Sequence, residues 1–235
     1  MRTIGLIGGM SWESSAEYYR VLNELVKARL GGLHSAECVL YSVDFAPIEA
    51  MQHAGEWDDA GRALAAVARK VERGGADFVL LCTNTMHKVA DAITNALTVP
   101  LIHIADPTAE AITAAGIRTV GLLGTKFTME EAFYRGRLIE RFGLNVVTPD
   151  AADRDTVHRI IYDELCLGII REESRAAYRA IMARLVAQGA QGIILGCTEI
   201  TLLVRAEDAT VPLFDTTRLH AERAVDLALM PSSFA

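Results

Sequence analysis

The side chains best suited to moving a proton lie in two short segments, each directly after an apolar run. Residues 196–199, with the sequence GCTE, contain Cys197, one of four cysteines. A helix that opens just after this cysteine would lower the pKa of its thiol from about 8.5, because exposed N–H groups at a helix start favour the thiolate. A thiolate can act as a nucleophile or a base, whereas a free cysteine is more commonly a small core residue. Position alone leaves both interpretations of Cys197 open.

The second segment covers residues 83–87, with the sequence TNTMH. Thr83, Asn84 and Thr85 could bind a ligand, but side chains of these types also commonly cap the helix that follows a strand. His87 lies four residues after Thr83 and is expected to be structural, as histidines at a helix start usually are. These residues by themselves favour a structural role about two to one.

Two threonines follow a third apolar run. Thr125 and Thr128 could likewise either bind a ligand or cap a helix. Thr128-x-x-Glu131 matches a capping box, which predicts Thr128 as a cap. Other motifs are missing from the sequence. The glycines at 8 and 9 fit neither nucleotide-binding pattern, the six histidines lack metal-ligand spacing, and no cysteines pair as C-x-x-C. We therefore predict neither a metal site nor a bound nucleotide.

A scaffold that gathers strand ends is needed to bring these segments together. Apolar runs predict strands at residues 3–7, 38–43, 78–81, 101–104, 119–123, 145–147, 192–195 and 211–214. Amphipathic segments lie between them, such as the one with apolar residues at 18, 21, 22, 25 and 26 that ends at two glycines. Apolar strands alternating with helices indicate an α/β fold with parallel sheets covered on both faces. Ligands bind beyond the carboxyl ends of such strands, where both polar segments lie.

The chain also resembles itself. The run IGLIG at residue 4 matches VGLLG at residue 120, GADFVLL at 75 matches GAQGIIL at 189, and VPLI at 99 matches VPLF at 211, with offsets of 116, 114 and 112. Three matches in the same order indicate an internal duplication. The offset of 114 aligns Thr83 with Cys197. Two halves facing each other about a pseudo-twofold axis would bring these side chains to one cleft from opposite sides, which suits chemistry on two faces of one carbon.

Composition restricts the class of protein. The 235 residues are 51% hydrophobic and carry a formal net charge of −7, which excludes overall disorder and argues against a general nucleic-acid or anionic-membrane binder. No apolar stretch approaches the roughly 20 residues of a membrane span. The N-terminal run is too short for a signal peptide. A reduced cytoplasmic protein is expected.

At these segments the sequence resembles the aspartate/glutamate racemase family, which racemises amino acids without a cofactor. The resemblance covers nearly the whole chain and rests on IGLIGGM at residue 4, NTMH at residue 84 and GCTE at residue 196. It implies two pseudo-symmetric α/β domains, each a parallel sheet flanked by helices, with the active site in the cleft between them. The matching segments place these domains at residues 1–100 plus 212–235 and at 101–211.

The resemblance also implies a mechanism. In the family one cysteine removes the Cα proton as a thiolate, and a second delivers a proton to the opposite face. The first family cysteine directly precedes the asparagine, and this sequence has Thr83 there. Cys82 is one residue earlier and should point to the opposite face of an extended segment. We expect Cys197 to act as the base and Thr83, or a water it holds, to serve the other face. A threonine hydroxyl is a very weak acid, so it is almost never in the basic form that could remove a proton. Only the face served by Cys197 should therefore lose its proton readily, and the L enantiomer should be favoured.

The resemblance also suggests how the substrate is held. Asn84, Thr85, Thr125 and backbone N–H groups at helix starts are expected to bind the α-carboxylate, since helix N-termini favour anions. The full set of predicted binding residues is Met10, Gln52, Asn84, Thr85, Thr125, Thr128 and Thr198. Relatives have basic residues near Gln52 and Cys166, and this sequence has none there, so the amino-acid range stays open. We expect no cofactor, no nucleic-acid or membrane partner, a small amino acid as substrate, and a homodimer.

Two other functions remain open. A protein with a single active cysteine could decarboxylate or isomerise a dicarboxylate, and exchange of the Cα proton without loss of CO2 would separate that reaction from racemisation. The same cleft could instead belong to a non-catalytic amino-acid-binding module. Replacing Cys197 by serine should abolish turnover and spare binding in an enzyme.

Overall fold

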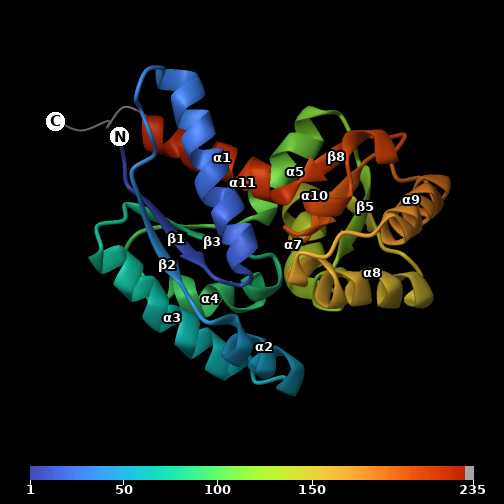
Figure 1. Ribbon diagram of the computed structural model, residues 1–235, viewed down its shortest axis with the longest axis horizontal. Helices are drawn as coiled ribbons and strands as arrows, with labels where there is room; N and C mark the ends of the chain where they lie inside the picture. The colour runs from blue at the N-terminus through green and yellow to red at the C-terminus, as the bar shows by residue number, and fades with distance from the viewer. Residues whose placement is uncertain (231–235) are drawn as a thin grey trace. The chain divides into compact units, whose positions relative to one another are not determined.

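The computed structural model describes residues 1–230 and divides the chain into two compact units (Figure 1). The first contains residues 1–104 and returns at His220, and the second runs from Ala105 to Leu219. Each unit is built on its own four-stranded sheet, and all strand pairs in both sheets are parallel. The predicted two-domain α/β fold is confirmed.

The sheet of the first unit has the order β2-β1-β3-β4. Its strands are β1 (Ile4–Gly8), β2 (Cys38–Ser42), β3 (Phe78–Leu81) and β4 (Leu101–Ile102). Its helices are α1 (Trp12–Leu30), α2 (Phe45–Ala54), α3 (Trp57–Arg73), the 3-10 helix η1 (Thr85–Val89), α4 (Ala90–Thr94) and α11 (Thr216–Leu229), of which α11 follows β8 and returns to this unit at His220. Helix α1 ends at Gly31, whose φ of 73° is in the left-handed region, as the two glycines predicted.

Helices cover both faces of this sheet because its strands are apolar on both sides. One face packs against α2, α3 and α4 through residues that include Leu64 and Val79, and the other packs against α1 and α11 through residues that include Tyr18 and Leu80. The two helices α1 and α11 thus share one face although they lie at opposite ends of the chain (Figure 1).

The sheet of the second unit has the equivalent order β6-β5-β7-β8. Its strands are β5 (Thr119–Gly124), β6 (Asn145–Val147), β7 (Ile193–Gly196) and β8 (Leu213–Asp215). Its helices are α5 (Ala105–Ala114), α6 (Lys126–Glu130), α7 (Ala132–Phe142), α8 (Ala151–Asp163), η2 (Leu165–Leu167), α9 (Glu172–Ala187), α10 (Ile200–Leu203) and η3 (Ala206–Asp208). None of the described helices combines the length and apolar character needed to cross a membrane.

One packing detail repeats in both units. A Cβ at Gly5 of β1 would lie 2.6 Å from a methyl of Val71, and a Cβ at Gly121 of β5 would lie 2.9 Å from a methyl of Leu185. Both glycines therefore allow a long helix, α3 or α9, to approach the first strand of its sheet closely. Val71 and Leu185 are 114 residues apart, the offset found between the repeated sequence segments.

The domain boundaries differ from those predicted. The chain leaves the first unit after Ile104 and returns to it at His220, whereas we predicted the changes at 100/101 and 211/212. Both predicted boundaries fall one strand too early, because β4 pairs with β3 and β8 pairs with β7. Each last strand completes the sheet before it. Residues 231–235 of the predicted first domain lie outside the described residues.

Candidate active site

The end of β3 carries the first predicted catalytic position. Side chains of Phe78, Leu80 and Cys82 alternate onto the face covered by α1 and α11, so Cys82 is fully buried in that core. Burial raises the pKa of the Cys82 thiol far above its ordinary value. Cys82 therefore points into the core, as the alternation of an extended segment predicts. Thr83 is the next residue, with 8% of its surface exposed.

The residues that follow Thr83 are equally enclosed. Asn84 and Thr85 are more than 90% buried where the chain turns into η1. Gln52 of α2 lies in the same region, because its amide nitrogen is 2.8 Å from the sulfur of Met86. Met10 is also buried, in the same core cluster as Met86. The first unit thus brings four of the predicted binding residues, Met10, Gln52, Asn84 and Thr85, to the carboxyl edge of its sheet.

The loop after β1 is shaped by a glycine that no other residue could replace. Gly9 has a φ of 95°, and a Cβ there would lie 2.2 Å from the carbonyl oxygen of Val43. Ser11 caps α1, with its side chain accepting from the N–H of Ser14, and Ser15 accepts from the N–H of Gly9 at 2.7 Å. These bonds fix the loop that carries Met10.

Thr125 and Thr128 lie after β5 in the second unit. The prediction that Thr128 is a helix cap is wrong: Thr125 is the cap of α6, and its hydroxyl accepts from the N–H of Thr128 at 3.3 Å. Thr128 is fully buried, and its hydroxyl lies 3.2 Å from that of Thr125. The N–H of Lys126 donates to Nδ1 of His158. Two of the N–H groups at this helix start, those of Lys126 and Thr128, are thus already bonded within the protein.

Cys197 follows β7 and is paired with a carboxylate. Its thiol donates to Oε2 of Glu199 at 2.8 Å, and the hydroxyl of Thr198 donates to the same oxygen at 2.8 Å. Cys197 and Glu199 are 8% and 3% exposed. A buried carboxylate is stabilised by such donors, since it has lost its contacts with water.

The pKa of Cys197 moves in the direction opposite to our expectation. Burial raises the pKa of this thiol well above its ordinary value, and the nearby Glu199 and Cys166 raise it further. The predicted lowering assumed a helix directly after the cysteine, but α10 begins only at Ile200 and has four residues. Desolvation and a neighbouring negative charge therefore outweigh any helix effect.

Two residues beside this thiol, Glu199 and Tyr178, were not predicted as part of the site. For Glu199 the signal is its position, because a carboxylate two residues from a candidate base can exchange a proton with it. Tyr178 of α9 is fully buried, and burial followed by the charges of Cys197 and Glu199 raises its pKa well above the ordinary value. Its hydroxyl donates to the carbonyl of Val157 at 3.5 Å. No sequence pattern distinguishes Tyr178 from an ordinary core tyrosine.

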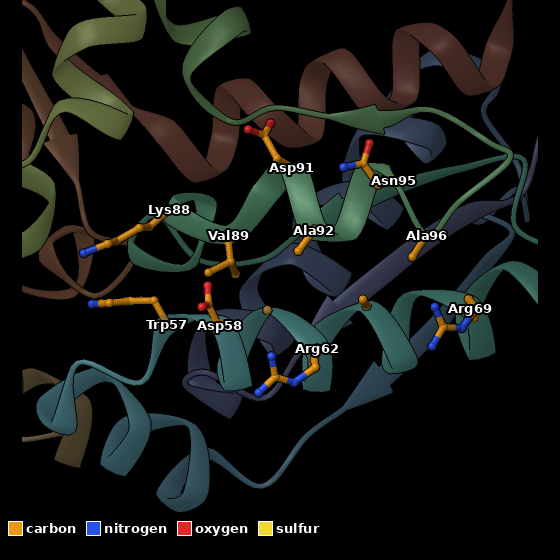
Figure 2. Close-up of a pocket in the computed structure, with 12 residues that line it drawn as sticks. Trp57, Asp58, Arg62, Arg69, Lys88, Val89, Asp91, Ala92, Asn95 and Ala96 are labelled. Atoms are coloured by element: carbon orange, nitrogen blue, oxygen red, sulfur yellow. The ribbon is translucent and has the colours of Figure 1, made fainter.

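A separate groove lies between α3 and α4 (Figure 2). It has a volume of about 540 Å³, and the ammonium of Lys88 lies 3.9 Å from the ring centre of Trp57 at one end. Its lining includes the small residues Gly61, Ala65, Ala92 and Ala96, and the side chains of Asp91 and Asn95 point away from α3. None of the predicted site residues lines the groove. Within residues 1–230, no cluster of three or more metal-ligating side chains occurs.

Two parallel sheets of the same order, with a thiol–carboxylate pair after one central strand and a buried Thr-Asn-Thr loop after the other, match the class of two-domain α/β amino-acid racemases. The Asp/Glu/Hydantoin racemase family profile matches residues 7–224, and the chain belongs to this family. It is therefore an amino-acid racemase, which is an isomerase.

Individual relatives agree with this assignment. The broad-specificity amino-acid racemase RacX of Bacillus subtilis is 24% identical over 234 residues, covering 96% of this chain and 98% of RacX. The solved structure of a Yersinia pestis protein, provisionally described as an Asp/Glu racemase, is 59% identical with a TM-score of 0.91 and covers 98% of this chain and 100% of that one. An aspartate racemase homologue from Pyrococcus horikoshii is 34% identical with a TM-score of 0.84, covering 97% and 99%.

Proposed function

We propose that this racemase acts on aspartate and glutamate without a cofactor, with Cys197 as the base on one face of Cα and Thr83, or a water that it holds, on the other. The observation that carries the proposal is the Cys197–Glu199 hydrogen bond, because it gives a thiol of raised pKa a place to send its proton. The proposal requires the two units to present Cys197 and Thr83 to opposite faces of the substrate.

The reaction begins with a proton transfer inside the second unit. The thiol of Cys197 passes its proton to the carboxylate of Glu199, which leaves a thiolate and a neutral acid with the same total charge. This exchange avoids placing a second negative charge in a buried site. The thiolate then removes the Cα proton of the L enantiomer, and Cys197 becomes a thiol again.

The carbanion is reprotonated from the face of Thr83. A threonine hydroxyl can donate a proton only if it regains one at once, so a water bound to Thr83 completes the step. Glu199 then releases its proton to solvent and becomes a carboxylate again. A second proton from solvent replaces the one that Thr83, or its bound water, gave to the carbanion. In the reverse direction the Thr83 face must act as a base, which a neutral hydroxyl does poorly, so L substrates are turned over faster than D substrates.

Substrate binding uses hydroxyl and amide groups. Asn84, Thr85 and Thr125 bind the α-carboxylate and stabilise the charge that develops on it, as preorganised donors do. Thr198 is oriented by its bond to Glu199. Gln52 is the candidate for the side-chain carboxylate and can only donate neutral hydrogen bonds to it. We therefore propose a modest preference for acidic amino acids.

The test of this proposal is a chiral assay. L-aspartate and L-glutamate are incubated with the protein without added cofactor, and the D enantiomer is expected to appear until the mixture is 1:1. The initial exchange of Cα–H with deuterium is then compared for L and D substrates. Faster exchange for L supports the asymmetry, and equal rates contradict it.

A second candidate is a one-cysteine decarboxylase or isomerase of a dicarboxylate. It is favoured by the single thiol among the site residues, since Cys82 is in the core. Loss of CO2 without Cα exchange would support this reaction against racemisation. A non-catalytic binding module would bind the ligand without loss of CO2 and without exchange of the Cα proton. A homodimer and a cytoplasmic location, without nucleic-acid or membrane partners, complete the proposal.

A further inference from the structure

A buried histidine joins Thr83 to the end of the first unit. His87 is 2% exposed, and its Nδ1 lies 2.8 Å from the carbonyl oxygen of Thr83. Its other ring nitrogen, Nε2, lies 3.1 Å from the backbone nitrogen of Ile104. Ile104 is the last residue of the first unit before the chain passes to the second. One imidazole therefore holds both the candidate catalytic residue and the point where the chain leaves the unit.

These two partners determine the protonation state of the ring. A carbonyl oxygen can only accept, so Nδ1 must carry a hydrogen. A backbone N–H can only donate, so Nε2 must offer a lone pair. His87 is therefore the neutral Nδ1–H tautomer, which is the less common form of a free imidazole. A proton on Nε2 would face the N–H of Ile104 and break that bond.

The second connection between the units is held in a similar way. His220 is the first residue after the chain returns, and its Nε2 lies 2.8 Å from the carbonyl oxygen of Ile102. The hydroxyl of Tyr18 lies 2.8 Å from its Nδ1. The ring of His103 lies 4.4 Å from that of His87. His87 and His220 thus both bind the backbone at the carboxyl end of β4, and His87 also contacts the carbonyl of Thr83.

We propose that His87 is the positioning residue for the Thr83 face of the active site. As a neutral Nδ1–H imidazole it sets the direction of the Thr83 backbone and ties that backbone to Ile104. This inference rests on the proposed function, because it assigns Thr83 to reprotonation. His87 itself carries no proton to the substrate, since both of its ring nitrogens are hydrogen-bonded to the backbone.

Removal of His87 should selectively slow the inversion of configuration at Cα. If His87 holds only the Thr83 face, removing it should leave Cys197 able to exchange the Cα proton of an L substrate while slowing delivery of a proton to the other face. A general loss of structure would slow both rates together. The ratio of racemisation to exchange therefore distinguishes positioning from simple stabilisation.

The activity test compares three variants. His87→Leu removes both hydrogen bonds and should lower the ratio of racemisation to exchange by about tenfold, since small errors of placement are expensive at a reacting centre. His87→Asn keeps a donor near the position of Nδ1 and should restore much of the ratio. His103→Asn, in the same cluster, is the matched control and should leave the ratio unchanged. An unchanged ratio in folded His87→Leu would overturn the proposal.

A spectroscopic test does not depend on activity, and it uses His87→Asn, which keeps a donor near Nδ1, for assignment once its spectrum shows that it is folded. Long-range ¹⁵N–¹H correlation spectra of the wild-type protein at pH 7 should contain one histidine with the Nδ1–H tautomer pattern that disappears in His87→Asn. An Nε2–H or doubly protonated His87 would refute the inference. If the wild type instead shows no Cα exchange with any amino acid, the proposed function fails, and the tautomer result still decides the hydrogen-bonding role of His87.

Discussion

The two units use the same strand order for different local chemistry. β3 and β7 occupy equivalent places in their sheets, and Thr83 and Cys197, which lie just beyond their ends, are 114 positions apart. After β3 the chain presents a threonine whose carbonyl is held by an imidazole, and after β7 it presents a thiol bonded to a buried carboxylate. A duplicated scaffold thus preserves where a reactive group sits but not what that group is.

The two units also differ in how they hold the loops that lead into their last strands, β4 and β8. In the first unit Glu72 of α3 accepts from the N–H groups of Thr98 and Val99 just before β4. In the second unit Arg175 and Arg179 of α9 bind Asp208 before β8. In both units the long helix holds this loop by charge, but the sign of the charge on the helix is reversed.

The largest expected effect is at the thiol. Cys197→Ser should reduce kcat by roughly a thousandfold or more, because a serine hydroxyl is a far weaker acid than a thiol and cannot reach the basic form near neutral pH. Binding of L-aspartate, measured by calorimetry, should persist. Cys38→Ser in the first unit is the control and should keep normal turnover. Turnover by Cys197→Ser within tenfold of the wild type would mean that the two strand ends do not differ as proposed.

Glu199→Gln tests whether the carboxylate makes the thiol a base. Loss of the proton acceptor should reduce kcat about a hundredfold, the usual size of a general acid–base contribution. Burial is the largest cause of the raised pKa of Cys197, and the charge of Glu199 adds to it. The pKa of the thiol should therefore fall in this variant, and alkylation by iodoacetamide should reach half its maximal rate at lower pH.

The control for this variant is Glu164→Gln. Glu164 is a buried carboxylate of the same unit that accepts from the hydroxyl of Ser174 at 2.6 Å. The pH dependence of Cys197 alkylation should change much less in the control. A rise in the thiol pKa of Glu199→Gln would contradict the assigned pairing.

Thr83→Cys should make the two strand ends chemically alike. A thiol on this face can act as a base, so the exchange rate of D substrates should rise by about tenfold or more, while the rate from L substrates changes less. Deuterium exchange followed by NMR measures both rates. Thr83→Ser keeps a hydroxyl and should keep the preference for L. A Thr83→Cys variant with the original asymmetry would place the catalytic position elsewhere.

The smallest effect concerns stability. Burial opposes ionisation of Asp208, but Arg175, the backbone of Arg205 and Arg179 outweigh it and lower its pKa from 3.8 to about 2. A group with a lowered pKa stabilises the fold above its unfolded pKa, and this stability is lost as pH falls from about 5 towards 2. Asp208→Asn should lower the free energy of unfolding at pH 7 by about 1–2 kcal/mol, discounted because Arg179 is partly exposed.

Denaturant unfolding at pH 7 and at pH 2.5 measures this effect. The difference in unfolding free energy between the wild type and Asp208→Asn should be much smaller at pH 2.5 than at pH 7, because Asp208 is partly protonated at the lower pH. Glu72→Gln in the first unit should change stability less, because Glu72 is only partly buried whereas the side chain of Asp208 is fully buried. An equal or larger loss in Glu72→Gln would show that the two loops depend on charge to the same degree.

The sequence predicted the fold well because the repeat and the strand pattern are local signals. Strands 78–81 and 145–147 match β3 and β6 at both ends, and the other predicted strands lie within two residues of those observed at each end. Helix α2 was not predicted, so the surroundings of Gln52 were unknown. The domain boundaries were misplaced because strand pairing, which assigns β4 and β8, is a non-local property.

The site was predicted less completely for the same physical reason. Thr83 and Cys197 could be found because they stand at strand ends and match a family motif, and the burial of Cys82 followed from alternation. The partner of Cys197, the tautomer of His87 and the direction of the thiol pKa depend on which groups approach in space. A capping motif indicated Thr128, whereas the helix start observed in the structure places the cap at Thr125.

The sequence by itself determined the α/β class, the duplication and the two strand ends where chemistry is expected, because periodicity and repetition are written along the chain. The tertiary structure alone decided that Cys197 is a buried thiol bonded to Glu199 and that His87 joins Thr83 to Ile104. Desolvation and hydrogen-bond geometry exist only once distant segments pack together, and these two effects set the proton chemistry of the site.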